Sequence, residues 1–352
     1  MNRDKFYMGR CLELARSGSY YVAPNPMVGC VIVHGDRIIG EGFHQKCGEA
    51  HAEVNAIASV KDKSLLKEST LYVNLEPCSH HGKTPPCADL IVKHQLKRVV
   101  IANKDINPEV SGRGIARLEA NNIEVVSGIR KSDAYNLNRR FFTFHKKKRP
   151  YILLKWAQSA DGYLDMQRED ASARINWISN EKCKRLSHIW RAEESAILVG
   201  KNTVLLDNPS LTTREIAGPN PIRILLDPEN SLYNHGEGKG KWNIFDDKAS
   251  TLVFNYQEDK KDNRIECIKL NRDKDFLTQM LSVLYERQVQ SVMVEGGRFT
   301  LDRFIENNLW DEARIIRGLP FFTNGVKAPE LKLRPIISEI LGGDHIDYYI
   351  PQ

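Results

Sequence analysis

The sequence lacks any long apolar run. Runs such as residues 31–33 and 99–102 fall far short of the roughly 20 apolar residues that a membrane helix needs. The first residues alternate charged and apolar side chains, so the apolar core of a signal peptide is missing as well. We therefore expect a cytoplasmic protein that makes no contact with a membrane.

Cysteine is sparse and the net charge is small. The seven cysteines are an odd number in a chain of 352 residues, which argues against a disulfide framework. The 51 Lys and Arg against 45 Asp and Glu leave a charge of +6, which suits anionic small molecules as well as nucleic acid. The 41% hydrophobic and 27% charged residues exclude a disordered, collagen-like or coiled-coil chain. At roughly 150 residues per domain, the length predicts about two domains.

Short β-rich runs alternate with helical patterns over the first 140 or so residues. Residues 28–33 and 37–43 flank turn residues and predict a hairpin. The remaining pattern predicts helices over 52–60, 86–95 and 114–120, and strands over 70–75, 98–102 and 123–126. This order indicates an α/β layered domain.

A run of basic residues, 146–149, ends at Pro150 and predicts a solvated connector between domains, with a nucleic-acid contact as the alternative. A second α/β pattern follows it. Strands are predicted over 151–156, 195–199, 222–226, 251–255 and 291–295, helices over 181–192 and 276–288, and an irregular loop over 228–248. We therefore predict domains 1–145 and 146–352, with no internal repeat.

The most informative pattern combines His51, Glu53, Cys78 and Cys87. One imidazole and two thiolates are good Zn²⁺ ligands and leave a fourth tetrahedral position for water, whose pKa the metal lowers toward neutrality. Glu53 follows the His ligand on the opening turn of a helix, where its carboxylate can move the proton of that water. This H-x-E…P-C…C order is that of the zinc nucleobase deaminases. Buried structural cysteines with a surface histidine, or a purely structural zinc, are the alternatives.

The spacing of the two cysteines leads to a narrower family. Residues 78–87 have the sequence CSHHGKTPPC in place of the short P-C-x-x-C of other deaminases, and the segments PNPMVG (24–29) and GEGFH (40–44) precede them. Together they resemble the bifunctional deaminase/reductase of riboflavin biosynthesis. The resemblance implies that Asn25, His44, His80 and Lys83 contact the pyrimidine ring and the ribose phosphate of the substrate.

The second half is less distinctive when its residues are considered alone. Residues 294–300, VEGGRFT, place two glycines between a strand and a helix, where backbone N–H groups can hold a phosphate. The G-x-G-x-x-G fingerprint of classical dinucleotide-binding domains is absent. Residues 207–214, DNPSLTTR, form a polar loop for which an ordinary turn is the simplest interpretation.

The resemblance continues through residues 151–331 and implies a reductase domain that uses NADPH without that fingerprint. The implied fold is an N-terminal cytidine-deaminase-like α/β/α layered domain followed by a dihydrofolate-reductase-like α/β domain. The implied NADPH contacts are Ala157, Trp177, Thr203, Asp207 and the turn beginning at Gly297. The implied substrate contacts are Arg191, Leu211, Arg214 and Glu295, with the two arginines on the phosphate, while Lys155 and Asp207 lie nearest the reacting ribose carbon. Ile175 stands where the family often has a substrate-contacting Ser, a contact that Ser179 could replace.

The sequence thus predicts two successive reactions on one phosphorylated pyrimidine, with Zn²⁺ and NADPH as cofactors. The first removes the exocyclic amine of the ring as ammonia, and the second reduces the ribose to a ribityl chain. A zinc deaminase of nucleosides or nucleic acid with an accessory C-terminal domain is the alternative. We expect no nucleic-acid partner, and the family implies a homo-oligomer.

Overall fold

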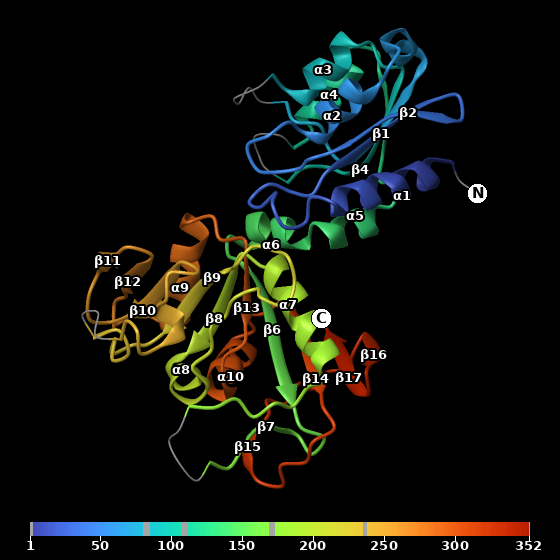
Figure 1. The fold of residues 1–352 in the computed structure, drawn as a ribbon. Coiled ribbons are helices and arrows are strands. Elements are labelled where there is room, and N and C mark those ends of the chain that lie inside the picture. Colours follow the sequence, from blue (N-terminus) through green and yellow to red (C-terminus); the bar gives the residue numbers. More distant parts are fainter. Residues whose placement is uncertain (1–2, 80–84, 107–110, 169–172, 235–237, 352) are drawn as a thin grey trace. The chain divides into compact units, whose positions relative to one another are not determined.

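The computed structural model describes residues 3–79, 85–106, 111–168, 173–234 and 238–351. It divides into two compact units, Met1–Lys148 and Arg149–Gln352, each built on a sheet of its own (Figure 1). Every helix among the described residues is too short or too polar to cross a membrane.

The first unit is built on a five-stranded sheet in the order β2-β1-β3-β4-β5. β3, β4 and β5 run parallel, whereas β1 pairs antiparallel with both β2 and β3. The strands are β1 (Gly29–His34), β2 (Arg37–Phe43), β3 (Thr70–Leu75), β4 (Arg98–Asn103) and β5 (Glu124–Ser127). The helices are α1 (Arg3–Arg16), α2 (Ala52–Ser59), η1 (Lys63–Glu68), α3 (Cys87–Lys93), α4 (Arg113–Glu119), α5 (Lys131–Leu137) and α6 (Arg139–Lys147).

Alternating apolar residues give this sheet a core on each face. On β1, Cys30 and Ile32 pack toward α2, α3 and α4, while Val31 and Val33 pack toward α1 and α5. This two-residue period is what a strand covered on both faces requires. The resulting α/β/α layers are visible in Figure 1.

The second unit is built on a ten-stranded sheet in the order β11-β12-β10-β9-β8-β13-β6-β14-β17-β16, with a small β15-β7 pair beside it. Its strands are β6 (Tyr151–Gln158), β7 (Tyr163–Met166), β8 (Ala196–Gly200), β9 (Ile222–Leu226), β10 (Thr251–Asn255), β11 (Lys260–Asp262), β12 (Ile265–Lys269), β13 (Ser291–Val294), β14 (Glu312–Arg317), β15 (Gly325–Lys327), β16 (Ile337–Leu341) and β17 (Asp344–Tyr349). Its helices are α7 (Glu181–Glu193), α8 (Lys201–Asp207), η3 (Asn243–Phe245), α9 (Phe276–Glu286) and α10 (Arg298–Glu306).

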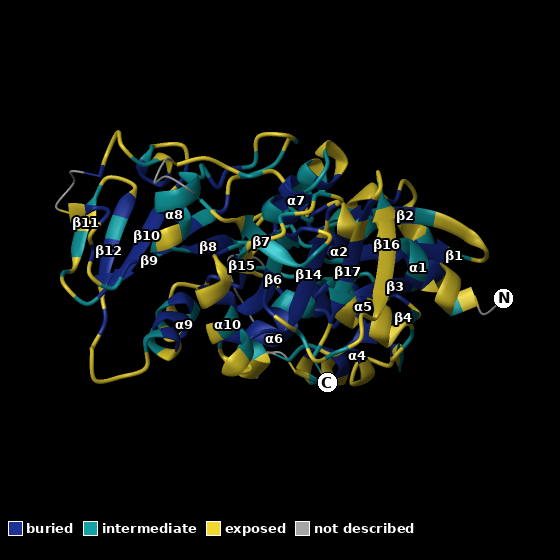
Figure 2. Cartoon of the chain, turned by 90° about the horizontal axis from the view of Figure 1, so that it is seen from below, coloured by how far each residue is buried: buried dark blue, intermediate teal, exposed yellow. Residues whose placement is uncertain are grey.

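The central strands β8, β13 and β6 are parallel neighbours, and most of their residues are buried, as the dark blue of β8 illustrates in Figure 2. Their registers set Val294 beside both Leu154 and Leu198, so the residues that follow these positions meet at one edge of the sheet. In open α/β sheets, ligands bind outside the carboxyl ends of such strands. The fold therefore brings Lys155, Gly200 and Glu295 to one ligand-binding edge.

The predicted hairpin and the predicted strands over 70–75, 222–226 and 251–255 are confirmed. The prediction of a solvated connector is wrong for Arg149, because its guanidinium donates hydrogen bonds to the buried Asp311 carboxylate at 2.6 Å and 3.0 Å. Lys146 and Lys147 are exposed, as expected, but belong to the last turn of α6, which buries Phe141, Phe142 and Phe144. The predicted boundary after residue 145 falls inside this helix.

Candidate active sites

His51, Cys78 and Cys87 converge in the first unit. His51 is the N-cap of α2, Cys78 follows β3, and Cys87 begins α3. Nδ1 of His51 lies 3.5 Å from Sγ of Cys78 and 3.4 Å from Sγ of Cys87. Zinc–nitrogen and zinc–sulfur bonds at a tetrahedral angle place the two ligand atoms about 3.6 Å apart. The three side chains therefore fit a common zinc ion.

Cys78 is the thiol poised to lose its proton, whereas the hydrogen bond to Cys78 and burial raise the pKa of the Cys87 thiol. Cys87 donates hydrogen bonds to Sγ of Cys78 from its thiol and, at 3.3 Å, from its backbone N–H. The thiol contact lowers the pKa of Cys78 to about 4, with His51 adding to the effect. A metal ion would displace the remaining proton, since thiolates rather than thiols are its ligands.

Glu53 lies in the first turn of α2, two residues after the His ligand, and is buried. Burial raises the pKa of its carboxyl to about 6, with the charge of Cys78 acting in the same direction. A carboxyl group with a pKa near neutrality is suited to both accepting and donating a proton. The acid/base role of Glu53 stays a prediction, for which this carboxyl has suitable surroundings.

Asn25 and His44 lie beside the cysteine cluster. The side-chain amide of Asn25 is 3.0 Å from Nε2 of His44, and Nδ1 of His44 is 3.0 Å from the carbonyl oxygen of Ala50. Because the carbonyl oxygen of Ala50 can only accept a hydrogen bond, Nδ1 of His44 carries the proton and Nε2 accepts a hydrogen bond from the Asn25 amide. The His44 and His51 rings meet edge to face with centroids 5.6 Å apart. His80 and Lys83, the other predicted substrate contacts here, lie outside the described residues.

Sequence reasoning gave Glu76 no role, although the residue stands two positions before a zinc ligand. Its buried carboxylate accepts four backbone hydrogen bonds of 3.0–3.2 Å, from residues 105, 112, 114 and 115. Gly114 also lies so close to this turn that a Cβ would come within 2.1 Å of the Pro77 carbonyl oxygen. Glu76 thus ties the segment that carries Cys78 to the start of α4.

The second unit contains a cavity of about 1080 Å³ at the carboxyl ends of its central strands. Every residue predicted for the reductase site lines it: Lys155, Ala157, Trp177, Arg191, Thr203, Asp207, Leu211, Arg214, Glu295 and Gly297. Ile175 and Ser179 line it as well. A cavity of this size can admit a dinucleotide with a small substrate, which fits NADPH.

Glu295 is the electrostatic centre of this cavity. Arg191 donates to both carboxylate oxygens, at 3.1 Å and 2.7 Å, and Nζ of Lys155 lies 3.8 Å away. Burial alone would raise the pKa of Glu295, but the charges of Arg191 and Lys155 outweigh it and lower the pKa to about 2. Burial in turn lowers the pKa of Lys155 below its ordinary value.

The Gly-Gly turn joins β13 to α10 and has Gly297 as the helix N-cap. The backbone N–H of Gly297 donates to the hydroxyl of Thr203 at 3.0 Å. A Cβ added at Gly200 would lie 2.7 Å from the hydroxyl of Thr300. The backbones of the two strand-to-helix turns also approach closely, since a Cβ at Gly296 would lie 3.2 Å from the backbone nitrogen of Gly200. Such an arrangement suits close contact with the phosphates of a dinucleotide.

Two further residues belong to this site. Arg168 pairs with the predicted Asp207 at 2.9 Å, while burial raises the pKa of Asp207 to about 6. His188 lies on the same face of α7 as Lys184 and Arg191, and all three line the cavity. The i, i+4, i+7 spacing of these polar residues was the signal that could have identified His188.

Comparison with known proteins identifies a family model for each half of the chain. The family model of the cytidine and deoxycytidylate deaminase zinc-binding region matches residues 1–103, and that of the RibD C-terminal domain matches residues 150–323. A riboflavin biosynthesis protein RibD from Aquifex aeolicus is 37% identical, covering 98% of both chains. The Escherichia coli RibD is 35% identical, covering 95% of this chain and 96% of its own.

Solved structures are similar over the whole chain. A diaminohydroxyphosphoribosylaminopyrimidine deaminase/5-amino-6-(5-phosphoribosylamino)uracil reductase from Thermotoga maritima is 35% identical, covers 99% of both chains and has a TM-score of 0.89. An Acinetobacter baumannii RibD is 30% identical with a TM-score of 0.85 over 99% of both chains.

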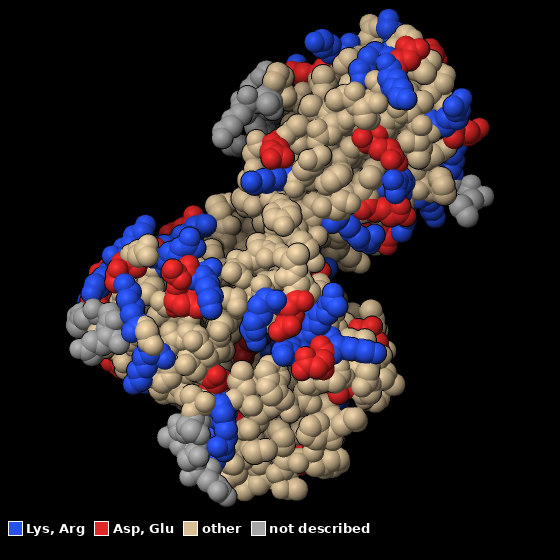
Figure 3. All heavy atoms as spheres, viewed as in Figure 1, with Lys and Arg blue, Asp and Glu red and all other residues tan. Residues whose placement is uncertain are grey.

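A zinc-dependent deaminase domain is thus followed by an NADPH-dependent reductase domain with a dihydrofolate-reductase-like fold. The chain belongs to the RibD family of bifunctional riboflavin biosynthesis enzymes. The alternative of a nucleic-acid deaminase is not favoured. On the described part of the face drawn in Figure 3, Lys and Arg side chains are interspersed with Asp and Glu.

Proposed function

We propose that each predicted residue acts in one of two successive steps on a phosphorylated diaminopyrimidine, the deaminase residues within 1–145 and the reductase residues within 146–352. When bound, zinc supplies an activated water and NADPH supplies a hydride. The observation that carries the proposal is the close approach of His51, Cys78 and Cys87 beside the buried Glu53.

In the deaminase site, Glu53 takes a proton from the attacking water and delivers it to the exocyclic amino nitrogen of the ring, which leaves as ammonia. Its pKa of about 6 lets one carboxyl perform both transfers near neutral pH. Asn25 and His44 hold the pyrimidine, with His80 and Lys83 on the ring and ribose phosphate. Because Nδ1 of His44 donates to Ala50, its ring orientation is fixed before substrate binds.

In the reductase site, Ala157, Trp177, Thr203, Asp207 and Gly297 hold NADPH. Leu211, Glu295 and the guanidinium groups of Arg191 and Arg214 hold the deaminated substrate, with Arg214 the more available for its phosphate. Lys155 and Asp207 stand nearest the ribose carbon that receives the hydride. The lowered pKa of Lys155 favours release of its proton, which suits protonation of the sugar oxygen as the ring opens.

We also propose a cytoplasmic homo-oligomer. All seven cysteines are free, which suits a reducing compartment. β16 is an edge strand with Ile337 and Ile340 exposed, and such an edge favours pairing with another chain. Light scattering of the purified protein measures the oligomeric state, and a monomeric mass would contradict this part of the proposal.

The experiment that tests the proposed function is incubation of the purified protein with the diaminopyrimidine ribotide, with and without NADPH. Ammonia should appear in both reactions, whereas NADPH should be consumed only after deamination. NADPH oxidation without ammonia release would contradict the assigned order.

A further inference from the structure

Residues 207–214 form one wall of the reductase cavity, to which Asp207, Leu211 and Arg214 contribute. The structure describes this whole segment, and residues 208–214 belong to no helix or strand. Asn208 and Leu211 have φ angles of 40° and 53°, in the left-handed region that is unfavourable for a leucine. The conformation of this wall therefore depends on contacts from its neighbours.

On one side the wall is held by α7. Nη1 of Arg191 donates to the carbonyl oxygen of Thr212 at 3.4 Å, and the N–H of Arg214 donates to Nδ1 of His188 at 3.3 Å. Both side chains line the cavity themselves, so these contacts belong to the site already described.

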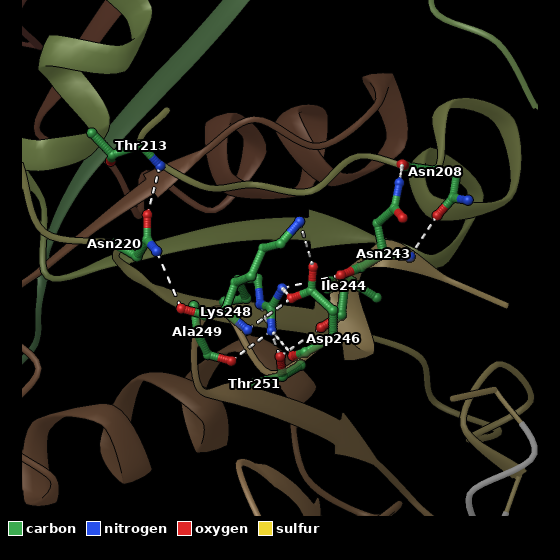
Figure 4. A network of polar contacts seen from close by, with 10 residues as sticks. Asn208, Thr213, Asn220, Asn243, Ile244, Asp246, Lys248, Ala249 and Thr251 are labelled. Carbon is green, nitrogen blue, oxygen red and sulfur yellow. Dashed lines mark hydrogen bonds and ion pairs between the residues drawn. The ribbon is translucent and has the colours of Figure 1, made fainter. Parts of the chain in front are cut away.

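On the other side, two asparagines outside the cavity lining hold the two ends of the wall (Figure 4). Asn243 binds Asn208 twice, from its backbone N–H at 2.8 Å and from its side-chain amide at 2.7 Å. The side-chain oxygen of Asn220 accepts from the N–H of Thr213 at 2.8 Å, and its amide donates to the carbonyl oxygen of Lys248 at 3.1 Å. Both ends are thereby fastened to one segment, residues 243–249.

That segment is itself anchored by Arg223 on β9, which is fully buried. All five N–H donors of its guanidinium are used: three on the carbonyl oxygens of residues 243, 246 and 249, one on the Asp246 carboxylate and one on the Thr251 hydroxyl. Ile244 and Phe245 pack in the same core cluster as Leu211. The segment is thus a rigid support rather than a free loop.

We infer that Asn243 and Asn220 are positioning residues of the reductase, which align the wall 207–214 from outside the cavity. Asn243 acts on the end that carries Asp207, and Asn220 acts on the end that carries Arg214. The inference rests on the proposed function, in which Asp207 holds NADPH beside the reacting ribose carbon and Arg214 binds the more distant substrate phosphate. The two asparagines should therefore affect different ligands.

The test uses the full-length, zinc-loaded enzyme with the variants Asn243→Ala and Asn220→Ala. Both asparagines are exposed, so the variants should fold. Asn220→Ala should raise KM for the deaminated substrate about three- to tenfold and leave KM for NADPH within about twofold, as expected for one or two lost hydrogen bonds. Asn243→Ala should raise KM for NADPH over the same range. Asn220→Asp keeps an acceptor for Thr213 and should recover most of the substrate affinity.

Asn307→Ala is the matched control, since this exposed C-cap residue of α10 donates its side-chain hydrogen bond to the Arg303 carbonyl oxygen of the same helix. It should match the wild type, and deamination should be unchanged in every variant. The inference would be overturned if both KM values were unchanged in the two asparagine variants, or if each variant raised KM equally for the substrate and for NADPH. The proposed function fails separately, if the wild-type protein consumes no NADPH with the deaminated substrate or if Arg214→Ala leaves the substrate KM unchanged.

Discussion

Arg191 donates hydrogen bonds to both carboxylate oxygens of Glu295, although sequence reasoning assigned its guanidinium to the substrate phosphate. The pair is almost completely buried and has Lys155 beside it. The charge of Arg191 is thus committed to Glu295, whereas Arg214 is 44% exposed and lies 3.7 Å from its neighbour Glu215. Of the two arginines predicted to hold the substrate phosphate, Arg214 is therefore the one that we propose binds it.

Arg214→Ala should raise the reductase KM for the phosphorylated substrate roughly 10- to 100-fold, the effect of losing a charge-assisted hydrogen bond worth about 1.5–3 kcal/mol. Deamination should persist. Steady-state kinetics of both activities measures this, with the exposed Arg272→Ala as control. Equal loss of both activities would argue against separate sites.

Glu53→Gln should retain zinc while deamination falls by roughly 10²- to 10⁴-fold, as expected for loss of a positioned acid/base group. Reduction of the deaminated substrate should be unaffected. Ammonia release and metal content measured on one preparation check both parts. Unchanged ammonia release would remove Glu53 from the mechanism.

Cys87→Ala should strip zinc from the protein, because an imidazole and a single thiolate remain. Cys47→Ala is the matched control, since Cys47 is exposed and lies outside the metal-ligand group. Elemental analysis should find zinc in the control and almost none in Cys87→Ala. A full metal complement in Cys87→Ala would mean that the ligands are misassigned.

Glu76→Gln should destabilise the first unit by about 3 kcal/mol, since an amide cannot replace a buried carboxylate that accepts several backbone N–H groups. Zinc affinity should fall with it because Cys78 lies two residues away. Denaturant unfolding and zinc titration measure the two effects, with the exposed Glu119→Gln as control. Stability equal to that of the control would rule out this anchoring role.

The stability of the protein should depend on His188 at mildly acidic pH. Burial, with Arg191 and Arg214, lowers the pKa of His188 to about 4. In the unfolded chain, a histidine has a pKa of about 6.5, so it is protonated at a pH at which His188 in the folded chain stays neutral. Proton binding to the unfolded chain therefore lowers the stability of the fold as pH falls from about 6.5 to about 4. The Tm of the His188→Gln variant should therefore fall less than the Tm of the wild type when the pH is lowered from about 7 to about 4.5. An identical loss in both proteins would show that His188 is not held neutral.

The sequence predicted the strands well where β-rich runs were bounded by turn residues, as at residues 70–75 and 222–226. It did not predict α1, although the buried residues of that helix recur at helical spacing between charged ones, or the β16–β17 hairpin, whose β16 residues are mostly exposed. Arg149 looked like part of a solvated run because its partner Asp311 is distant in sequence.

The zinc ligands could be predicted because their chemistry requires particular residue types in a recognisable order. Arg168 and Glu76 could not, because their roles arise from contacts with residues far along the chain. The same holds for the pairing of Arg191 with Glu295, which joins α7 to the end of β13. Motifs identify the reacting groups, whereas the side chains that hold them depend on tertiary contacts.

The most direct test of two coupled sites on one chain is a time course in which ammonia and NADPH are followed together from the diaminopyrimidine ribotide. Ammonia should appear first, and NADPH should then be consumed in equal amount. Chelation of the metal should abolish both, and addition of the deaminated substrate should then restore NADPH consumption alone. Undiminished ammonia release from the folded, metal-free protein would contradict the account.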